Sequence, residues 1–326
     1  MKLTKIYKKA IEVGIANDLR GADEVRKILA EENERFKDLK DDDKKFYDRD
    51  KLFNPYADSR ILFGGDFKDE PNIKKIMVGI DIGVGELLLA HTLNKEQGAG
   101  IDLVLSHHPM GPAAAQLHDV MRLQARLLAK AGVTISVAEQ LMEKRIGEIE
   151  RRLLTINHTR EIDAARLLSL PLMCLHTPAD NCVTNHLTKL FDREKPNKLK
   201  DLMKLLRGIP EYERAARLQL PAKIVAGSDE NSCGKIFVDM TGGTEGSKDI
   251  FDKIAAGGVS TLVGMHFTEE HLANAKKANL NVVIAGHVSS DVLGLNLLLD
   301  RIEKEERLEF VCVGGFERIR RESKGK

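Results

Sequence analysis

The sequence predicts an α/β fold of two lobes, each with a mixed, mostly parallel sheet flanked by helices. Short apolar runs alternate with segments of helical periodicity from residue 74 onward, which is the pattern of parallel strands joined by right-handed crossovers. The 326-residue length exceeds the usual size of one domain and therefore favours two lobes. Residues 189–221 interrupt the alternation with charged, helical sequence and mark the expected boundary between the lobes.

Residues 1–53 are expected to form a polar, helical N-terminal extension. A weak apolar stripe runs along its first part, formed by Ile6, Ala10, Val13 and Ala16. Charged residues dominate 37–51, which is typical of a solvated helix end or a linker. Because the turn signal Asn54-Pro55-Tyr56-Ala57-Asp58 follows, we expect the core to begin near residue 54.

The first α/β lobe is expected to span residues 54–188. Its strands are short runs rich in Val, Ile, Leu and Met, expected at 75–80, 101–105, 133–137 and 172–175. Its helices carry apolar residues three and four positions apart, and they are expected at 83–93, 117–131 and about 138–170, with a break at 157–159.

After the charged helical insertion or linker at 189–221, a second α/β segment is expected at 222–326. The same alternation of apolar runs and helical periodicity predicts its elements. Its strands are expected at 223–226, 235–240, 260–264, 282–285 and 309–313, and its helices at about 247–256, 268–278 and 288–305.

The overall composition argues against several kinds of binding partner. The 51 basic and 50 acidic residues nearly cancel, so a net charge of +1 gives no electrostatic reason to expect a nucleic-acid or membrane-surface partner. The four cysteines form no Cys-x-x-Cys pair, which argues against a structural zinc ribbon. The charged N-terminus lacks an apolar signal core, and no apolar run is long enough to cross a bilayer. We therefore expect a cytoplasmic protein that acts on a small molecule.

Three of the expected strands lead into histidine motifs. The motifs are Ser106-His107-His108-Pro109, His176-Thr177-Pro178-Ala179-Asp180, and Gly286-His287 with Asp291 four residues later. In open α/β sheets, functional groups gather at the carboxyl ends of strands. The three motifs together therefore indicate a metal site, with enough ligands for two ions.

The chemistry of these side chains suits transition metals. Imidazole and carboxylate groups bind zinc, iron, manganese, cobalt or nickel, and two ions about 3.5–4 Å apart can support hydrolysis. His287 and Asp291 lie four residues apart at the start of an expected helix and so share one face. Taken singly, each motif also has a structural explanation, such as a buried, hydrogen-bonded histidine or, for Asp180, a helix cap.

Other candidate residues are less specific. Asp81, at the end of a strand, and His158 are candidates to carry a proton, and no side chain stands out as a dedicated base or nucleophile. The glycine-rich segment 241–248 lacks the Gly-Lys-Ser/Thr order of a P-loop. It either forms a plain turn or contacts a phosphate or oxyanion of the substrate.

The motifs, in this order, resemble those of the Nif-three-like dinuclear-metal family, whose members are often labelled type-2 GTP cyclohydrolase I homologues. The resemblance covers roughly residues 54–188 and 222–313. It implies two α/β lobes around a cleft, and homo-oligomers that are often ring-shaped hexamers. It also implies that two divalent transition-metal ions are bound by His107, His108, Asp180, His287 and Asp291, with Asp180 and Asp291 as the candidates to bridge them.

The chain departs from the family pattern at Asp291, where the family usually has Glu. The aspartate side chain is shorter by one methylene, so the sequence leaves open whether it reaches one ion or two.

We therefore favour a metal-dependent hydrolase in which a metal-bound water attacks a phosphoester or a carbon–nitrogen bond of a purine-like, nucleotide-like substrate. One alternative is a non-catalytic metal-binding, metal-delivery or regulatory interaction protein of the same fold. Another is a metal-free α/β binding module in which the histidines are structural.

Overall fold

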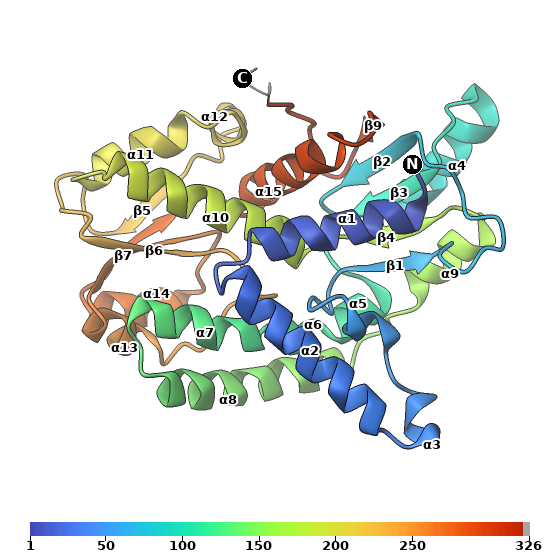
Figure 1. Ribbon diagram of the computed structural model, residues 1–326. Helices are drawn as coiled ribbons and strands as arrows, with labels where there is room; N and C mark the ends of the chain where they lie inside the picture. Colours follow the sequence, from blue (N-terminus) through green and yellow to red (C-terminus); the bar gives the residue numbers. More distant parts are fainter. Residues whose placement is uncertain (322–326) are drawn as a thin grey trace.

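Two separate sheets organise the computed structural model, in which residues 1–321 are described (Figure 1). The first sheet has the strand order β1-β4-β3-β2-β9, and the second has the order β5-β8-β7-β6. In each sheet one edge strand, β1 or β5, is antiparallel and the others run parallel. The predicted α/β fold with two mixed, mostly parallel sheets is therefore confirmed. The strands are β1 Arg60–Phe63, β2 Lys75–Gly79, β3 Leu103–Ser106, β4 Leu172–Cys174, β5 Lys223–Ala226, β6 Lys235–Asp239, β7 Val259–Gly264, β8 Asn281–Ile284 and β9 Glu309–Cys312.

Helices cover both faces of the first sheet. On one face, α4 (Val84–Gln97) and α9 (Arg160–Leu167) pack against the side chains of Met77, Val104 and Leu172. On the other face, α1 (Leu3–Ala16) and α15 (His287–Ile302) pack against a second set of strand residues that includes Ile76 and Leu105. These central strands are buried on both faces, which explains their nearly continuous apolar sequence.

The second sheet is covered in the same way. One face packs against α7 (Arg122–Ala131), α8 (Ile135–Leu153), α13 (Phe251–Ala256) and α14 (Glu269–Lys277). The other face packs against α10 (Thr177–Glu194), α11 (Leu199–Arg207) and α12 (Pro210–Arg217). Two short helices, α5 (Gly111–Ala115) and α6 (Leu117–Val120), connect the first sheet to α7.

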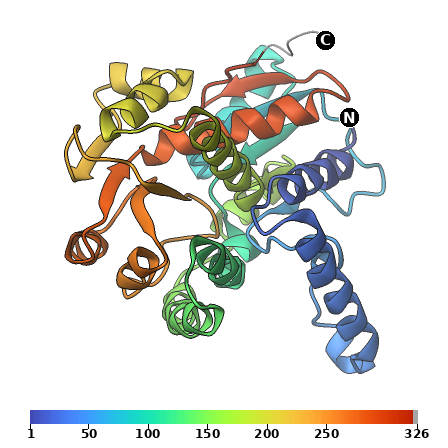
Figure 2. The same cartoon turned by 60° about the vertical axis from the view of Figure 1, so that its left-hand side comes forward.

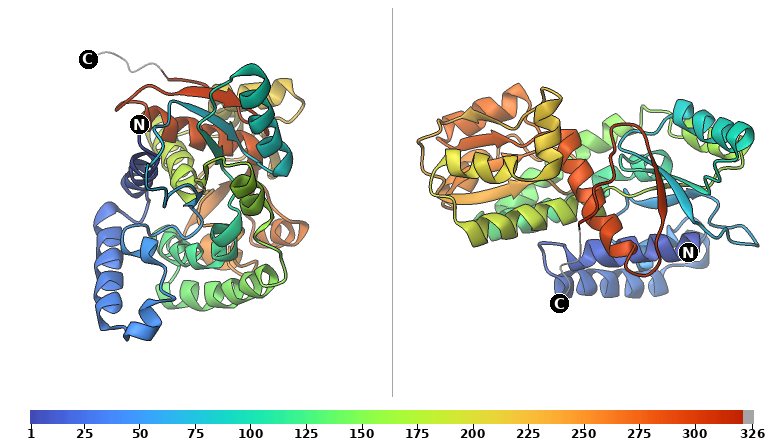
Figure 3. Two further views of the ribbon diagram at one scale, coloured as in Figure 1. Left: turned by 90° about the vertical axis from the view of Figure 1, so that its right-hand side faces the viewer. Right: turned by 90° about the horizontal axis from the view of Figure 1, so that it is seen from above.

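Helices α10 and α15 join the two lobes. Residues of both helices belong to the core under the first sheet and to the core under the second. Figure 2 shows α10 in the middle of the molecule, and the right-hand view of Figure 3 shows α15 between the two groups of strands. The helices approach closely because α15 has a glycine at the crossing. A Cβ on Gly294 would lie 2.5 Å from the carbonyl oxygen of Ala179.

The N-terminal segment is helical, and its first helix is part of the core. Leu3, Ile6 and Ala10 of α1 are fully buried, and Gly14 lies so close to α10 that a Cβ there would be 2.8 Å from the Cβ of Pro178. In contrast, α2 (Ala22–Asp38) extends away from the sheets along one side of the molecule (Figures 2 and 3), with Val25 as its one buried residue. The short helices α3 (Asp41–Lys44) and η1 (Arg49–Leu52) follow it.

Two details of the expected strand pattern are wrong. Residues 133–137 do not form a strand, because α8 begins at Ile135 and its buried residues Ala138, Met142, Ile146 and Ile149 follow the helical period. Strand β1 was not expected, since it is a four-residue edge strand whose partner β4 lies more than 100 residues later in the sequence.

The chain does not pass through the two sheets in sequence order. Strand β9 returns from the second lobe and pairs with β2 of the first sheet, while α7 and α8 pack on the second sheet. The expected boundaries at residues 53, 188 and 221 stay predictions. The last five residues of the expected segment 222–326 lie outside the described residues.

Within residues 1–321, none of the helices combines the length and the apolar character that a membrane crossing requires.

The α10–α15 crossing can be tested with Gly294→Ala. The added Cβ would overlap the Ala179 carbonyl, so the helices must separate, and we expect a loss of about 1–3 kcal/mol in the free energy of unfolding. Gly85→Ala in α4 is the matched control, because a Cβ there meets nothing within 4 Å and alanine favours the helix. Chemical denaturation of both variants measures the difference. Equal stability of the two variants would show that the crossing is not tight.

Candidate metal centre

The three histidine motifs meet at one place between the lobes. His107 and His108 follow β3, His176 lies between β4 and α10, and His287 is the first residue of α15 after β8. Backbone hydrogen bonds hold the first pair, because the N–H groups of His107 and His108 donate to the carbonyl oxygens of Gly79 and Ile80 at 2.9 and 3.0 Å. Each motif therefore stands at the carboxyl end of a parallel strand, as the sequence predicts.

Asp291 lies at the centre of the cluster. Its Oδ1 is 3.4 Å from His107 Nε2, and its Oδ2 is 3.5 Å from both His108 Nε2 and His287 Nε2. The side chain is 1% exposed, and neither oxygen has a hydrogen-bond partner among the described residues. The two oxygens thus face two different sets of histidines, although the side chain is shorter than glutamate.

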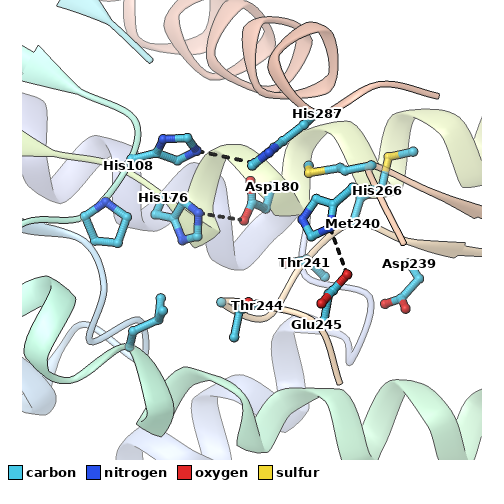
Figure 4. Close-up of a pocket in the computed structure, with 14 residues that line it drawn as sticks. His108, His176, Asp180, Asp239, Met240, Thr241, Thr244, Glu245, His266 and His287 are labelled. Carbon is cyan, nitrogen blue, oxygen red and sulfur yellow. Dashed lines mark hydrogen bonds and ion pairs between the residues drawn. The ribbon is translucent and has the colours of Figure 1, made fainter. Parts of the chain in front are cut away.

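Asp180 extends the cluster on its buried side. Its Oδ1 is 3.5 Å from His107 Nε2, and its Oδ2 is 3.7 Å from His176 Nε2 (Figure 4). Oδ1 of Asp180 and Nε2 of His107 are also buried without a hydrogen-bond partner within residues 1–321. Buried polar atoms are normally hydrogen-bonded, and leaving them unpaired is costly. The orphaned atoms therefore fit a bound cation.

The outer nitrogens of three histidines are anchored by the protein. Nδ1 of His108 faces Asp81 Oδ1 at 2.7 Å, and Nδ1 of His176 faces Asp58 Oδ2 at 2.8 Å. Nδ1 of His107 faces the Leu175 carbonyl oxygen at 3.1 Å. Each contact leaves Nε2 directed into the cluster, as in metal sites where a second group orients the histidine ligand. The candidate Asp81 is therefore placed where it positions His108.

Burial and neighbouring charges lower the pKa values of two residues of the cluster and raise those of two others. Burial lowers the pKa of His107 to about 4, so its ring is neutral and its Nε2 is available as a ligand. Burial also raises the pKa of Asp180 to about 8. For Asp291, burial acts upward, but the electrostatic effect of the neighbouring His107, His108 and His287 outweighs it and lowers the pKa well below the usual range. For His176, burial acts downward, but Asp180 and Asp58 raise the pKa to about 9.

The structure adds His176 to the five expected ligands. Three overlapping groups have potential ligand atoms within 4.8 Å of one another, namely His107, His108 and His176; His108, His287 and Asp291; and His107, Asp180 and Asp291. The sequence contains a signal for the sixth member, because His176 and Asp180 have the same four-residue spacing as His287 and Asp291. All five expected ligands come together in these groups, which could hold a metal ion.

A cavity of about 230 Å³ opens beside the cluster. Figure 4 shows His108 and His176 on one side of it and Asp239 and Glu245 on the other. His266 faces Glu245 Oε1 through Nδ1 at 2.9 Å, and its ring centre is 4.8 Å from that of His287. Asp239 was not singled out in the sequence, and Glu245 was named only as part of the segment 241–248, because only the fold brings these two residues to the histidine motifs.

The candidate His158 lies elsewhere. It is in the connection between α8 and α9, where its Nε2 faces the Leu153 carbonyl oxygen at 2.9 Å, and it does not line the cavity. The segment 241–248 does reach the cavity through Thr241, Gly243, Thr244 and Glu245.

Among solved structures, the fold is similar to that of a NIF3 superfamily protein from Sphaerobacter thermophilus, with a TM-score of 0.66 and 25% sequence identity. The matched region covers 80% of this chain and 92% of that protein. Reduced HcgD from Methanocaldococcus jannaschii has a TM-score of 0.47 at 14% identity, covering 77% of this chain and 87% of its own. TTHA1606 from Thermus thermophilus has a TM-score of 0.42 at 12% identity, covering 76% of this chain and 86% of its own. The last two scores are too low to carry an argument. No family model and no curated protein sequence matches the chain.

The raised pKa values predict proton release on metal binding. The pKa of His176 is raised to about 9 and that of Asp180 to about 8, so at pH 7 this interacting pair holds at least one proton in the metal-free cluster. A cation needs both groups deprotonated, so zinc should release at least about one proton, and its affinity should fall as the pH drops from about 9 to 7. Calorimetric titration in buffers of different ionisation enthalpy measures the release.

Asp58→Asn is the matched variant for this titration. It removes the charge that helps to raise the pKa of His176 while keeping an oxygen that can accept from Nδ1, so fewer protons should be released. Zinc binding with no proton release in either protein would contradict the expectation.

Proposed function

From the membership of this chain in the NIF3 superfamily and the geometry of the cluster, we propose that it binds two divalent transition-metal ions. With these ions it hydrolyses a phosphoester or a carbon–nitrogen bond of a purine-like substrate. The observation that carries the proposal is the position of Asp291, whose two oxygens face His107 on one side and His108 with His287 on the other. A carboxylate in this position suits two ions better than one.

The ligands divide into a buried set and an accessible set. His107, Asp180 and Asp291 are at most 5% exposed in their side chains and would hold one ion out of contact with solvent. His108 and His287 have 28% and 43% of their side chains exposed and would hold the other ion, with Asp291, at the cavity. His176 would add a ligand on the Asp180 side, since its Nε2 lies 3.7 Å from Asp180 Oδ2.

When bound, such an ion pair would supply activation of water and neutralisation of developing negative charge. The protein side chains keep the ligand geometry fixed. Asp58 and Asp81 hold His176 and His108 by their Nδ1 atoms, and the cavity reaches the cluster on the side where His108 and His287 are exposed. The ligands are nitrogen and oxygen atoms, which are compatible with zinc, iron, manganese, cobalt or nickel.

Elemental analysis of purified protein tests the number of ions. We expect about two equivalents of transition metal in the wild type and about one in His108→Ala/His287→Ala, because the buried set stays intact. His91→Ala in α4 is the matched control, since His91 belongs to none of the ligand groups. One equivalent in the wild type, or an unchanged content in the double variant, would contradict the two-ion assignment.

Turnover of a panel of phosphoesters and purine derivatives, measured with the metal-loaded proteins, tests the hydrolase. Turnover in the wild type should be lost in the double variant and kept in His91→Ala. Two bound ions with no turnover would instead favour the non-catalytic metal-binding or metal-delivery alternative. The expectations of a homo-oligomer and of a cytoplasmic location stay predictions.

A further inference from the structure

One wall of the cavity is formed by the second lobe, and it adjoins the metal cluster at His287, whose ring centre lies 4.8 Å from that of His266. Asp239 ends β6, and Glu245 lies in the segment that connects β6 to α13. Asp239 is exposed to the cavity, and within residues 1–321 its carboxylate accepts no hydrogen bond. On this wall, Asp239 therefore offers unused hydrogen-bond acceptors to the cavity.

Glu245 and His266 make this wall rigid. Glu245 Oε1 accepts from the backbone N–H of Thr268 at 3.1 Å and faces His266 Nδ1 at 2.9 Å. The connecting segment is held from α7, because Gln124 Nε2 donates to the carbonyl oxygens of Gly242 and Thr244, both at 2.7 Å. This wall, named here the acceptor wall, consists of the carboxylates of Asp239 and Glu245, with His266 paired to Glu245.

A smaller apolar hollow adjoins the cavity behind the acceptor wall. Its free volume is about 40 Å³, and it shares Asp239, Glu245 and His266 with the larger cavity. Three aromatic residues, Phe237, Phe251 and Phe267, contribute to its lining.

We propose that the acceptor wall binds the N–H edge of a planar, amidine-type group of the substrate, as found in cyclic guanidines and amino-substituted heteroaromatic rings. A carboxylate offers acceptors only, and it pairs best with two parallel N–H groups. Two carboxylates on one wall also disfavour an anion there, so the anionic or oxygen-bearing part of the substrate is directed to the metal cluster. This assignment rests on the proposed function, since it adds the substrate class and orientation at the same site.

The test uses two pairs of probes that share a ring system and differ in the amidine-type edge and in the positive charge that this edge carries. Benzamidine is compared with benzamide, and 2-aminobenzimidazole with benzimidazole, by calorimetry on the zinc-loaded and on the metal-free protein. We expect each amidine-type probe to bind at least roughly tenfold more tightly than its partner, because its two parallel N–H groups can pair with both oxygens of a carboxylate and an acceptor left unpaired is costly. Asp239→Asn should reduce that preference to near unity, since the amide presents N–H groups to the N–H edge.

Asp249→Asn is the matched control, because Asp249 is exposed in the same segment and does not line the cavity; it should keep the full preference. Equal affinities within both probe pairs, or a preference that Asp239→Asn leaves unchanged, would overturn the inference. Metal content of each protein is measured alongside. If the protein binds no metal but still prefers the amidine-type probes, the result would contradict the proposed function and would still support the acceptor wall as a binding site.

Discussion

The close contact between α10 and α15 at Ala179 and Gly294 fixes the geometry on which the site depends. Ala179 immediately precedes Asp180, and Gly294 lies one helical turn after Asp291, so the distance between the helices sets the distance between the two carboxylates. Because Gly294 has no side chain, α15 approaches to a separation at which a Cβ would lie 2.5 Å from the Ala179 oxygen. At that separation both carboxylates reach His107, at 3.5 and 3.4 Å. The contact of Gly14 with Pro178 then supports the start of α10 from the opposite side.

Such proximity has an electrostatic consequence. Two buried carboxylates near one another repel, and each loses solvation. The histidines offset only part of this cost, because the distances between Nε2 and the carboxylate oxygens, 3.4 to 3.7 Å, are too long for good hydrogen bonds. Asp58 and Asp81 meanwhile occupy the outer nitrogens of His176 and His108, which prevents these rings from turning to other partners. The folded chain therefore maintains an arrangement that a cation would stabilise, so metal binding and folding stability are coupled.

Much of this arrangement could be predicted from the sequence, because local patterns carry it. Apolar runs that end in His107 and His287 predict both the strands and the position of the histidines at their carboxyl ends. The pairing of β9 with β2 could not be predicted in this way, since it depends on contacts across more than 200 residues. The expected strand at 133–137 was also wrong because of tertiary packing. Ala138 and Met142 are buried as parts of a helix, and their packing outweighs the strand preference of the β-branched residues before them. Likewise, the reach of Asp291 depends on how closely α15 packs, which side-chain length alone does not determine.

The two ends of the cluster differ in a way that bears on function. His107 is completely buried, whereas 43% of the His287 side chain is exposed at the cavity. A substrate can therefore approach from one side only, and on that side the second lobe presents Asp239 and Glu245. Positive charge at the metal cluster and negative charge at the opposite wall would make the cavity electrically asymmetric. A substrate with an electron-rich end and an N–H-bearing end would fit in a single orientation, because the reverse orientation would place like charges together. Since the cluster belongs mainly to the first lobe and the wall to the second, the α10–α15 contact that brings the carboxylates together also sets the distance across which the substrate must extend.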